Sequence, residues 1–133
     1  MQGKCLCGAI TVSAPEQQQI DVCHCQMCRR WSGGPMLAVH CGSAVTFSGS
    51  IKPAVYQSSD WAERGFCPQC GSHLFYHLLP ADEYILPAGL FEQAFQMHSQ
   101  IFIEQKPDYY EFANQTPTLT GAEVFAQFAA DQG

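Results

Sequence analysis

The chain has 133 residues, enough for one domain with a modest hydrophobic core. Apolar residues make up 47% of the sequence, which predicts a globular rather than a disordered chain. Six Lys and Arg stand against twelve Asp and Glu, for a formal net charge of −6, and because polyphosphate binding needs a basic face we expect no nucleic-acid partner. No apolar run approaches the roughly 18 residues of a membrane span and no secretory leader is visible, so we expect a cytoplasmic protein without a membrane partner.

Eight cysteines dominate the chemistry that the sequence offers. Disulfides are rare in the reducing cytosol, so in a chain without a leader this number favours metal binding. Closely spaced cysteines are the usual way to present two thiolates to one tetrahedral Zn²⁺. The spacing of the cysteines therefore predicts zinc sites rather than a disulfide framework.

The first predicted element is the turn Cys5-Leu6-Cys7-Gly8, and a similar turn recurs at Cys67-Pro68-Gln69-Cys70-Gly71. In both turns a glycine follows the second cysteine, and glycine supplies a positive φ at no steric cost. Both turns are typical of zinc knuckles. We therefore predict one closed structural zinc site, which joins the N-terminal region to the middle of the chain and has four ligands: Cys5, Cys7, Cys67 and Cys70.

The next cluster along the chain places three cysteines, Cys23, Cys25 and Cys28, within six residues. Three protein ligands and one open position are typical of catalytic zinc. The alternative is a second structural site whose fourth ligand is Cys41, His24 or His40. The spacing alone leaves these alternatives open.

The rest of the chain predicts a mainly β fold in one domain, residues 1–133, with no linker and few long helices because eight prolines interrupt it. One helix is predicted near the end, where Thr120 and Glu123 fit a capping box and apolar residues from Val124 to Ala129 recur at helical spacing. We expect this helix to pack as a terminal brace. The predicted strands are Ala9–Ser13, Met36–His40, Ala44–Ser48, Val55–Ser58, His73–Leu78, Tyr84–Leu86 and Gln100–Glu104.

Several side chains near the three-cysteine cluster have both a functional and an ordinary interpretation. His24 could shuttle a proton, or it could face solvent or bond to backbone. Arg29 and Arg30 could pair with substrate carboxylates or offset an anionic zinc–thiolate centre. The run Ser32-Gly33-Gly34 predicts a turn that lets backbone approach the metal. Three aromatic residues could wall a pocket or belong to the core: Trp31, Tyr109 and Tyr110.

Four segments together resemble the glutathione-dependent formaldehyde-activating enzyme family: residues 3–10, 23–34, 64–75 and 100–111. The resemblance rests on three ordered cysteine motifs, Cys5-Leu6-Cys7-Gly8, Cys23-His24-Cys25-Gln26-Met27-Cys28 and Cys67-Pro68-Gln69-Cys70-Gly71. Two features depart from the family pattern. Cys41 has no counterpart in it, and Asp108-Tyr109 stands where members often carry a Trp-Tyr pair.

The resemblance implies an Mss4-like fold of several coiled small β-sheets around zinc, with a short C-terminal helix. It implies two Zn²⁺ per chain, one structural on Cys5, Cys7, Cys67 and Cys70 and one catalytic on Cys23, Cys25 and Cys28. It also implies a carbon–sulfur lyase that binds a small-molecule thiol, glutathione, and forms or cleaves its adduct with formaldehyde or a related electrophile. The alternative is a non-catalytic zinc module that binds glutathione or a protein, with both zincs structural.

Overall fold

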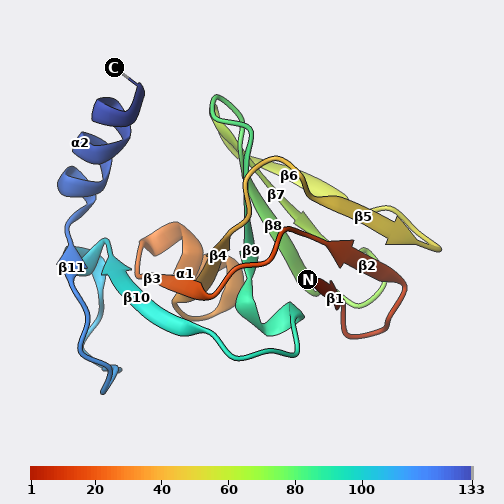
Figure 1. Ribbon diagram of the computed structural model, residues 1–133, viewed down its shortest axis with the longest axis horizontal. Helices are drawn as coiled ribbons and strands as arrows, with labels where there is room; N and C mark the ends of the chain where they lie inside the picture. The colour runs from red at the N-terminus through yellow and green to blue at the C-terminus, as the bar shows by residue number, and fades with distance from the viewer. Residues whose placement is uncertain (133) are drawn as a thin grey trace. The chain divides into compact units, whose positions relative to one another are not determined.

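The computed structural model describes residues 1–132 (Figure 1), and the chain divides into two compact units. The first unit combines the N-terminal residues Met1–Gln18 with Ala38–Phe95, and the second combines Gln19–Leu37 with the C-terminal part of the chain from Gln96. Each unit contains one group of closely spaced cysteines. None of the helices formed by residues 1–132 has the length and apolar character needed to cross a bilayer.

The first unit is built from antiparallel strands. A small sheet has the order β1-β2-β5, and a second run of strands has the order β4-β9-β8-β7-β6. The strands are β1 (Gln2–Lys4), β2 (Ile10–Ser13), β4 (Met36–His40, paired through Ala38–His40), β5 (Thr46–Gly49), β6 (Ala54–Ser59), β7 (Ala62–Phe66), β8 (His73–Leu78) and β9 (Glu83–Pro87); a single 3-10 turn, η1 (Ala88–Leu90), follows β9.

Alternation of apolar and polar residues along the strands determines which side chains enter the core of this unit. In β2, Ile10 and Val12 are buried while Thr11 faces solvent, where its hydroxyl lies 2.6 Å from the Ser48 hydroxyl on β5. Successive side chains of a strand point to opposite faces, so this short β2 sequence buries one face only. Leu74 and Leu86 on β8 and β9 are fully buried and complete the apolar interior.

The second unit contains parallel strands in the order β11-β10-β3. Parallel strands need long connections between them, and here residues 24–95 lie between β3 and β10 and residues 102–117 between β10 and β11. The elements are β3 (Gln19–Cys23), α1 (Gln26–Ser32), β10 (Gln96–Ile101), the 3-10 turn η2 (Ile103–Gln105), β11 (Thr118–Leu119) and α2 (Gly121–Gln132).

The C-terminal helix α2 begins with the predicted capping box. The Thr120 backbone N–H donates to Glu123 Oε1 at 2.9 Å, and the Glu123 backbone N–H donates to Thr120 Oγ1 at 3.2 Å. The packing differs from the predicted brace, because Phe125 makes an edge-to-face contact with Phe102 at 5.8 Å yet stays 60% exposed. The cap, and not burial of the apolar face, defines where this helix begins.

The mainly β architecture predicted from the sequence is confirmed, but the strands β1, β3, β7 and β11 were not predicted. The predicted strand Gln100–Glu104 is wrong at both ends: β10 begins at Gln96 and stops at Ile101, because Phe102 takes a left-handed backbone conformation (φ 54°) and η2 follows. Helix α1 was not predicted. Its seven residues have no acidic side chain in the first turn, and its N-cap is Cys25, an unusual capping residue.

We expect Gly65→Ala to lower the free energy of unfolding by about 1–3 kcal/mol, as overpacking of a core does. A Cβ at Gly65 on β7 would overlap the ring of Phe75, which is buried on the neighbouring strand β8. Urea unfolding at matched metal content measures the change. Gly89→Ala is the control, since a Cβ there meets no atom within 4 Å. Equal stability of the two variants would contradict this packing.

Candidate metal centres

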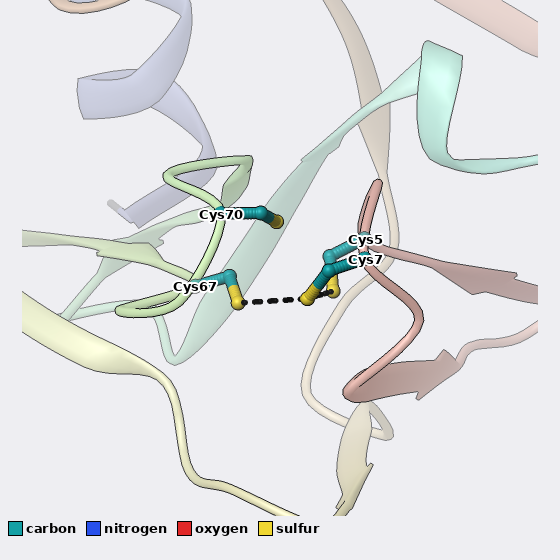
Figure 2. A group of neighbouring side chains, drawn as sticks. All are labelled: Cys5, Cys7, Cys67 and Cys70. Carbon is teal, nitrogen blue, oxygen red and sulfur yellow. Dashed lines mark hydrogen bonds between the residues drawn. The ribbon is translucent and has the colours of Figure 1, made fainter.

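Four cysteines of the first unit converge on one point. Cys5 and Cys7 lie in the turn after β1, Cys67 and Cys70 lie in the turn after β7, and all four sulfur atoms lie within 4.8 Å of one another (Figure 2). The Cys5–Cys7 and Cys7–Cys67 sulfur pairs are separated by 3.6 and 3.8 Å. A regular tetrahedron with Zn–S bonds of about 2.3 Å has edges of about 3.8 Å. These two separations therefore match a four-coordinate zinc site, and the four sulfur atoms supply its complete set of ligands.

Both turns have the backbone that the glycines predict. Gly8 and Gly71 have φ values of 77° and 79°, in the left-handed region that L side chains rarely adopt. The Gly8 backbone N–H donates to Cys5 O at 3.1 Å, and the Gly71 backbone N–H donates to Cys67 O at 2.8 Å. Each turn thus closes on its own first cysteine, and this closure directs both sulfur atoms of the turn to one side.

The protonation of this group is uneven when no cation is bound. The hydroxyl and backbone of Ser72 bond to Cys70 and lower the pKa of its thiol to about 5. The Ala9 backbone N–H lowers the pKa of Cys7, but partial desolvation and the neighbouring cysteines outweigh it and raise that pKa to about 11. Once one thiol of the group is ionised, the pKa of its neighbour rises. A bound divalent cation would favour the thiolate form of all four cysteines.

Three cysteines of the second unit form another group, with all sulfur atoms within 4.8 Å. Cys23 ends β3, Cys25 is the N-cap of α1, and Cys28 lies in the first turn of that helix. The Cys25 sulfur accepts the Cys28 backbone N–H at 3.4 Å, so one side chain both caps the helix and joins the group. Hydrogen bonds to the thiols of Cys25 and Cys28, and then burial, raise the pKa of Cys23, which again favours a bound cation over free thiolates.

Among the residues that the structure describes, this second group has no fourth cysteine, histidine or carboxylate. His40 Nδ1 lies 3.4 Å from Glu83 in the first unit. Cys41 also belongs to the first unit; its sulfur donates to Val39 O at 3.5 Å, and burial followed by the nearby Glu83 charge raises the pKa of its thiol to about 11. Neither residue joins the three sulfur atoms.

The remaining alternative ligand, His24, is fully buried, and both of its ring nitrogens are engaged. Nδ1 lies 2.7 Å from the Tyr110 hydroxyl, and Nε2 lies 2.8 Å from Gln100 Oε1. Burial lowers the pKa of the His24 imidazole, so the neutral ring is favoured. The interpretation of His24 as solvent-facing or bonded to backbone is wrong for the ring, which bonds to two side chains.

The other predicted neighbours have separate roles. Arg29 Nε donates to the His24 carbonyl at 3.1 Å, whereas Arg30 is exposed. The Gly33 N–H donates to Arg29 O at 2.8 Å with φ 85°, so this glycine is the C-cap of α1. Trp31 is half-buried, and Tyr109 is 76% exposed.

Sequence reasoning did not identify two glutamines around the second group. Gln100 bonds to the ring of His24, and Gln105 Oε1 accepts the Gln26 backbone N–H at 2.9 Å. The available signal was weak: Gln100 is a polar residue directly before the apolar run Ile101-Phe102-Ile103. A buried polar residue needs a hydrogen-bond partner, but the sequence does not say which one.

We expect Cys41→Ser to retain two metal ions per chain, because Cys41 lies outside both cysteine groups. The serine hydroxyl can still donate to the Val39 carbonyl, so the buried position keeps its hydrogen bond. Elemental analysis of the purified protein measures the stoichiometry. Cys28→Ser, which removes a member of the second group, is expected to leave one ion. Loss of an ion in Cys41→Ser would identify that cysteine as a ligand.

Comparisons with known proteins assign the chain to a family. The model of the family described as glutathione-dependent formaldehyde-activating enzyme matches residues 1–105. A Schizosaccharomyces pombe protein named as an uncharacterized lyase is 36% identical over 127 residues, which cover 92% of this chain and 93% of that protein. A crystal structure of a Rhodobacter sphaeroides protein matches with a TM-score of 0.59 at 24% identity, covering 71% of this chain and 90% of the other, and shares the fold. The chain therefore belongs to the glutathione-dependent formaldehyde-activating enzyme family.

Proposed function

We propose that the protein is a zinc-dependent carbon–sulfur lyase that forms or cleaves the adduct of a thiol, glutathione, with formaldehyde or a related electrophile. Family membership and the relative named as a lyase support the reaction class. The observation that carries the proposal is the convergence of three sulfur atoms, Cys23, Cys25 and Cys28, with no fourth protein ligand among residues 1–132. Three ligands and an open position are the usual composition of a catalytic zinc site.

The two groups have different proposed roles. Cys5, Cys7, Cys67 and Cys70 form a complete tetrahedral set, which supports a structural zinc. In the second group, a bound Zn²⁺ would supply an open coordination position at which an incoming thiol loses its proton. Both roles require reduced cysteines, because the thiolate is the form that ligates a metal ion. We therefore place the protein in a reducing compartment, the cytoplasm.

In this proposal the residues of the second unit bind the substrate and orient it. Cys23, Cys25 and Cys28 fix where the substrate sulfur is held, and the Cys28 N–H keeps the Cys25 sulfur in place. Arg29 and Arg30 carry positive charge beside an anionic cluster, which favours a substrate with carboxylates such as a glutathione-like peptide. Arg29 is committed to the His24 carbonyl through Nε, so Arg30, exposed on α1, is the better candidate for a substrate carboxylate.

The proposed reaction balances without a redox partner. In the forward direction the substrate thiolate sulfur attacks the carbonyl carbon of formaldehyde, and a C–S bond forms. The electron pair of the carbonyl π bond moves to oxygen, which takes a proton from water to give the S-hydroxymethyl hemithioacetal, and the proton that the thiol released neutralises the hydroxide left behind. The lyase direction is the reverse: the hydroxyl loses its proton, the carbonyl re-forms and the thiolate leaves. Stabilising the thiolate assists both directions.

Exchange NMR on fully metallated protein tests the proposal. We expect the protein to accelerate the interconversion of glutathione, formaldehyde and S-hydroxymethylglutathione over the spontaneous rate, and Cys25→Ser to abolish that acceleration. Serine is a good N-cap residue, so this variant keeps the start of α1 while losing the thiolate ligand. Loss of activity without loss of helicity, checked by circular dichroism, separates the chemistry from the fold.

Cys41→Ser is the matched control, since it also replaces a cysteine of the same chain but one outside both groups. It is expected to retain the wild-type exchange rate. No acceleration by wild-type protein that holds two zinc ions would overturn the lyase proposal for this substrate pair. Tight binding of glutathione in that case would favour a non-catalytic carrier.

A further inference from the structure

His24 lies between two cysteines of the second group, and each of its polar groups has a bonding partner. Its backbone N–H donates to Ile101 O at 3.1 Å, and its carbonyl accepts Arg29 Nε at 3.1 Å. The ring nitrogens Nδ1 and Nε2 bond to Tyr110 and Gln100 at 2.7 and 2.8 Å. A fully bonded and fully buried residue in a cysteine-rich loop is held in one orientation.

The chemistry of the partners fixes how the ring is protonated. Gln100 presents its amide oxygen, which only accepts, so His24 Nε2 carries the proton and donates it. In the neutral ring Nδ1 then accepts from the Tyr110 hydroxyl. Gln100 is itself held, because its amide nitrogen donates to Thr116 Oγ1 at 3.2 Å and its backbone N–H donates to Pro117 O at 3.0 Å. The series of hydrogen bonds from Tyr110 through His24 to Gln100 therefore ends at the Thr116 hydroxyl and the Pro117 carbonyl.

Aromatic contacts enclose the same ring. Tyr110 stacks against His24 with centroids 5.5 Å apart and an interplanar angle of 22°, and Phe112 lies at 6.0 Å. Lys106 Nζ lies 5.3 Å from the centre of the Tyr110 ring and 2.8 Å from Glu111 Oε2, so Tyr110 also contacts a paired cation. Residues 106–112 thus form an enclosure around the imidazole.

We propose that His24 is a positioning residue whose ring, clamped between Tyr110 and Gln100, holds Cys23 and Cys25 in the geometry that binds the metal ion. This inference rests on the proposed metal site at Cys23, Cys25 and Cys28. The two cysteines flank His24 directly in the chain, so an anchored ring restricts the backbone that carries both sulfur atoms. The three sulfurs then converge before the ion arrives, and binding costs less ordering of the loop.

A second pair of contacts favours positioning over simple core filling. The Gln26 backbone N–H is held by Gln105, and Arg29 reaches back to the His24 carbonyl. The loop from Cys23 to Cys28 is therefore anchored at its centre and on its helical side by residues that are not metal ligands. Such outer contacts orient metal ligands in proteins, and removing one typically weakens metal affinity by about 10-fold to 100-fold.

Tyr110→Phe tests the role with the least change, since it removes one hydroxyl and leaves the stacked ring. In a chelator-competition titration of the full chain with Zn²⁺, we expect affinity at the three-cysteine site to fall about 10-fold or more. Affinity at the four-cysteine site of the same chain is expected to stay unchanged and serves as the internal reference. Co²⁺ substitution gives a second readout, since a displaced sulfur ligand shifts the visible absorption of the three-cysteine site.

Tyr109→Phe is the matched control, because Tyr109 is 76% exposed and makes no hydrogen bond to His24. It is expected to leave both affinities and the Co²⁺ spectrum unchanged. If Tyr110→Phe unfolds, Gln100→Met tests the same clamp from the other ring nitrogen at similar side-chain volume, with the same expected loss. Wild-type affinity at the three-cysteine site in the folded variant, or an equal loss at both sites, would overturn the inference.

These readouts separate the inference from the proposed function. The affinity and the Co²⁺ spectrum are measured without substrate, so a selective loss in Tyr110→Phe supports the clamp whatever the exchange rate is. Wild-type protein that binds both ions but does not accelerate exchange overturns the lyase proposal alone. Wild-type protein that binds no ion at the three-cysteine site overturns both.

Discussion

Thiolates repel one another, and this repulsion governs both cysteine groups. All sulfur atoms of a group lie within 4.8 Å, a distance at which each ionised thiol raises the cost of ionising the next. Within the groups, hydrogen bonds between thiols and burial raise the pKa of Cys7 to about 11 and raise that of Cys23, whereas Ser72 lowers the pKa of Cys70 to about 5. A divalent cation reverses the sign of the interaction, because it attracts every sulfur at once. The turns that bring these cysteines together are therefore stabilised most when a metal ion is bound.

Different kinds of contact hold the cysteines of the two groups close together. The turns of the four-cysteine group close through local backbone hydrogen bonds and the positive φ of Gly8 and Gly71. The three-cysteine group instead relies on distant residues, since His24 is held by Gln100 and Tyr110, 76 and 86 positions further along the chain. A locally closed, four-ligand site suits a structural ion. The three-cysteine group has no fourth ligand among the described residues, and contacts from distant residues fix the loop that carries it.

This difference explains what the sequence could predict. Both knuckle turns follow from local spacing and glycine placement, and the structure has them with the predicted backbone. The grouping of Cys23, Cys25 and Cys28 also follows from spacing. The clamp on His24 does not, because a sequence pattern cannot show which buried glutamine or tyrosine will meet a given histidine. Helix α1 was missed for a related reason: its cap is a cysteine sulfur, which local rules do not count as a capping atom.

Within residues 108–112, some side chains contact the His24 ring and others face solvent. Tyr110 and Phe112 contact the imidazole, while Asp108 and Tyr109 lie exposed beside them. Tyr109 touches Tyr110 only edge to face, at 5.5 Å, so replacing it removes little buried contact. Changes at the exposed positions are therefore expected to leave the contacts of Tyr110 and Phe112 with the His24 ring intact.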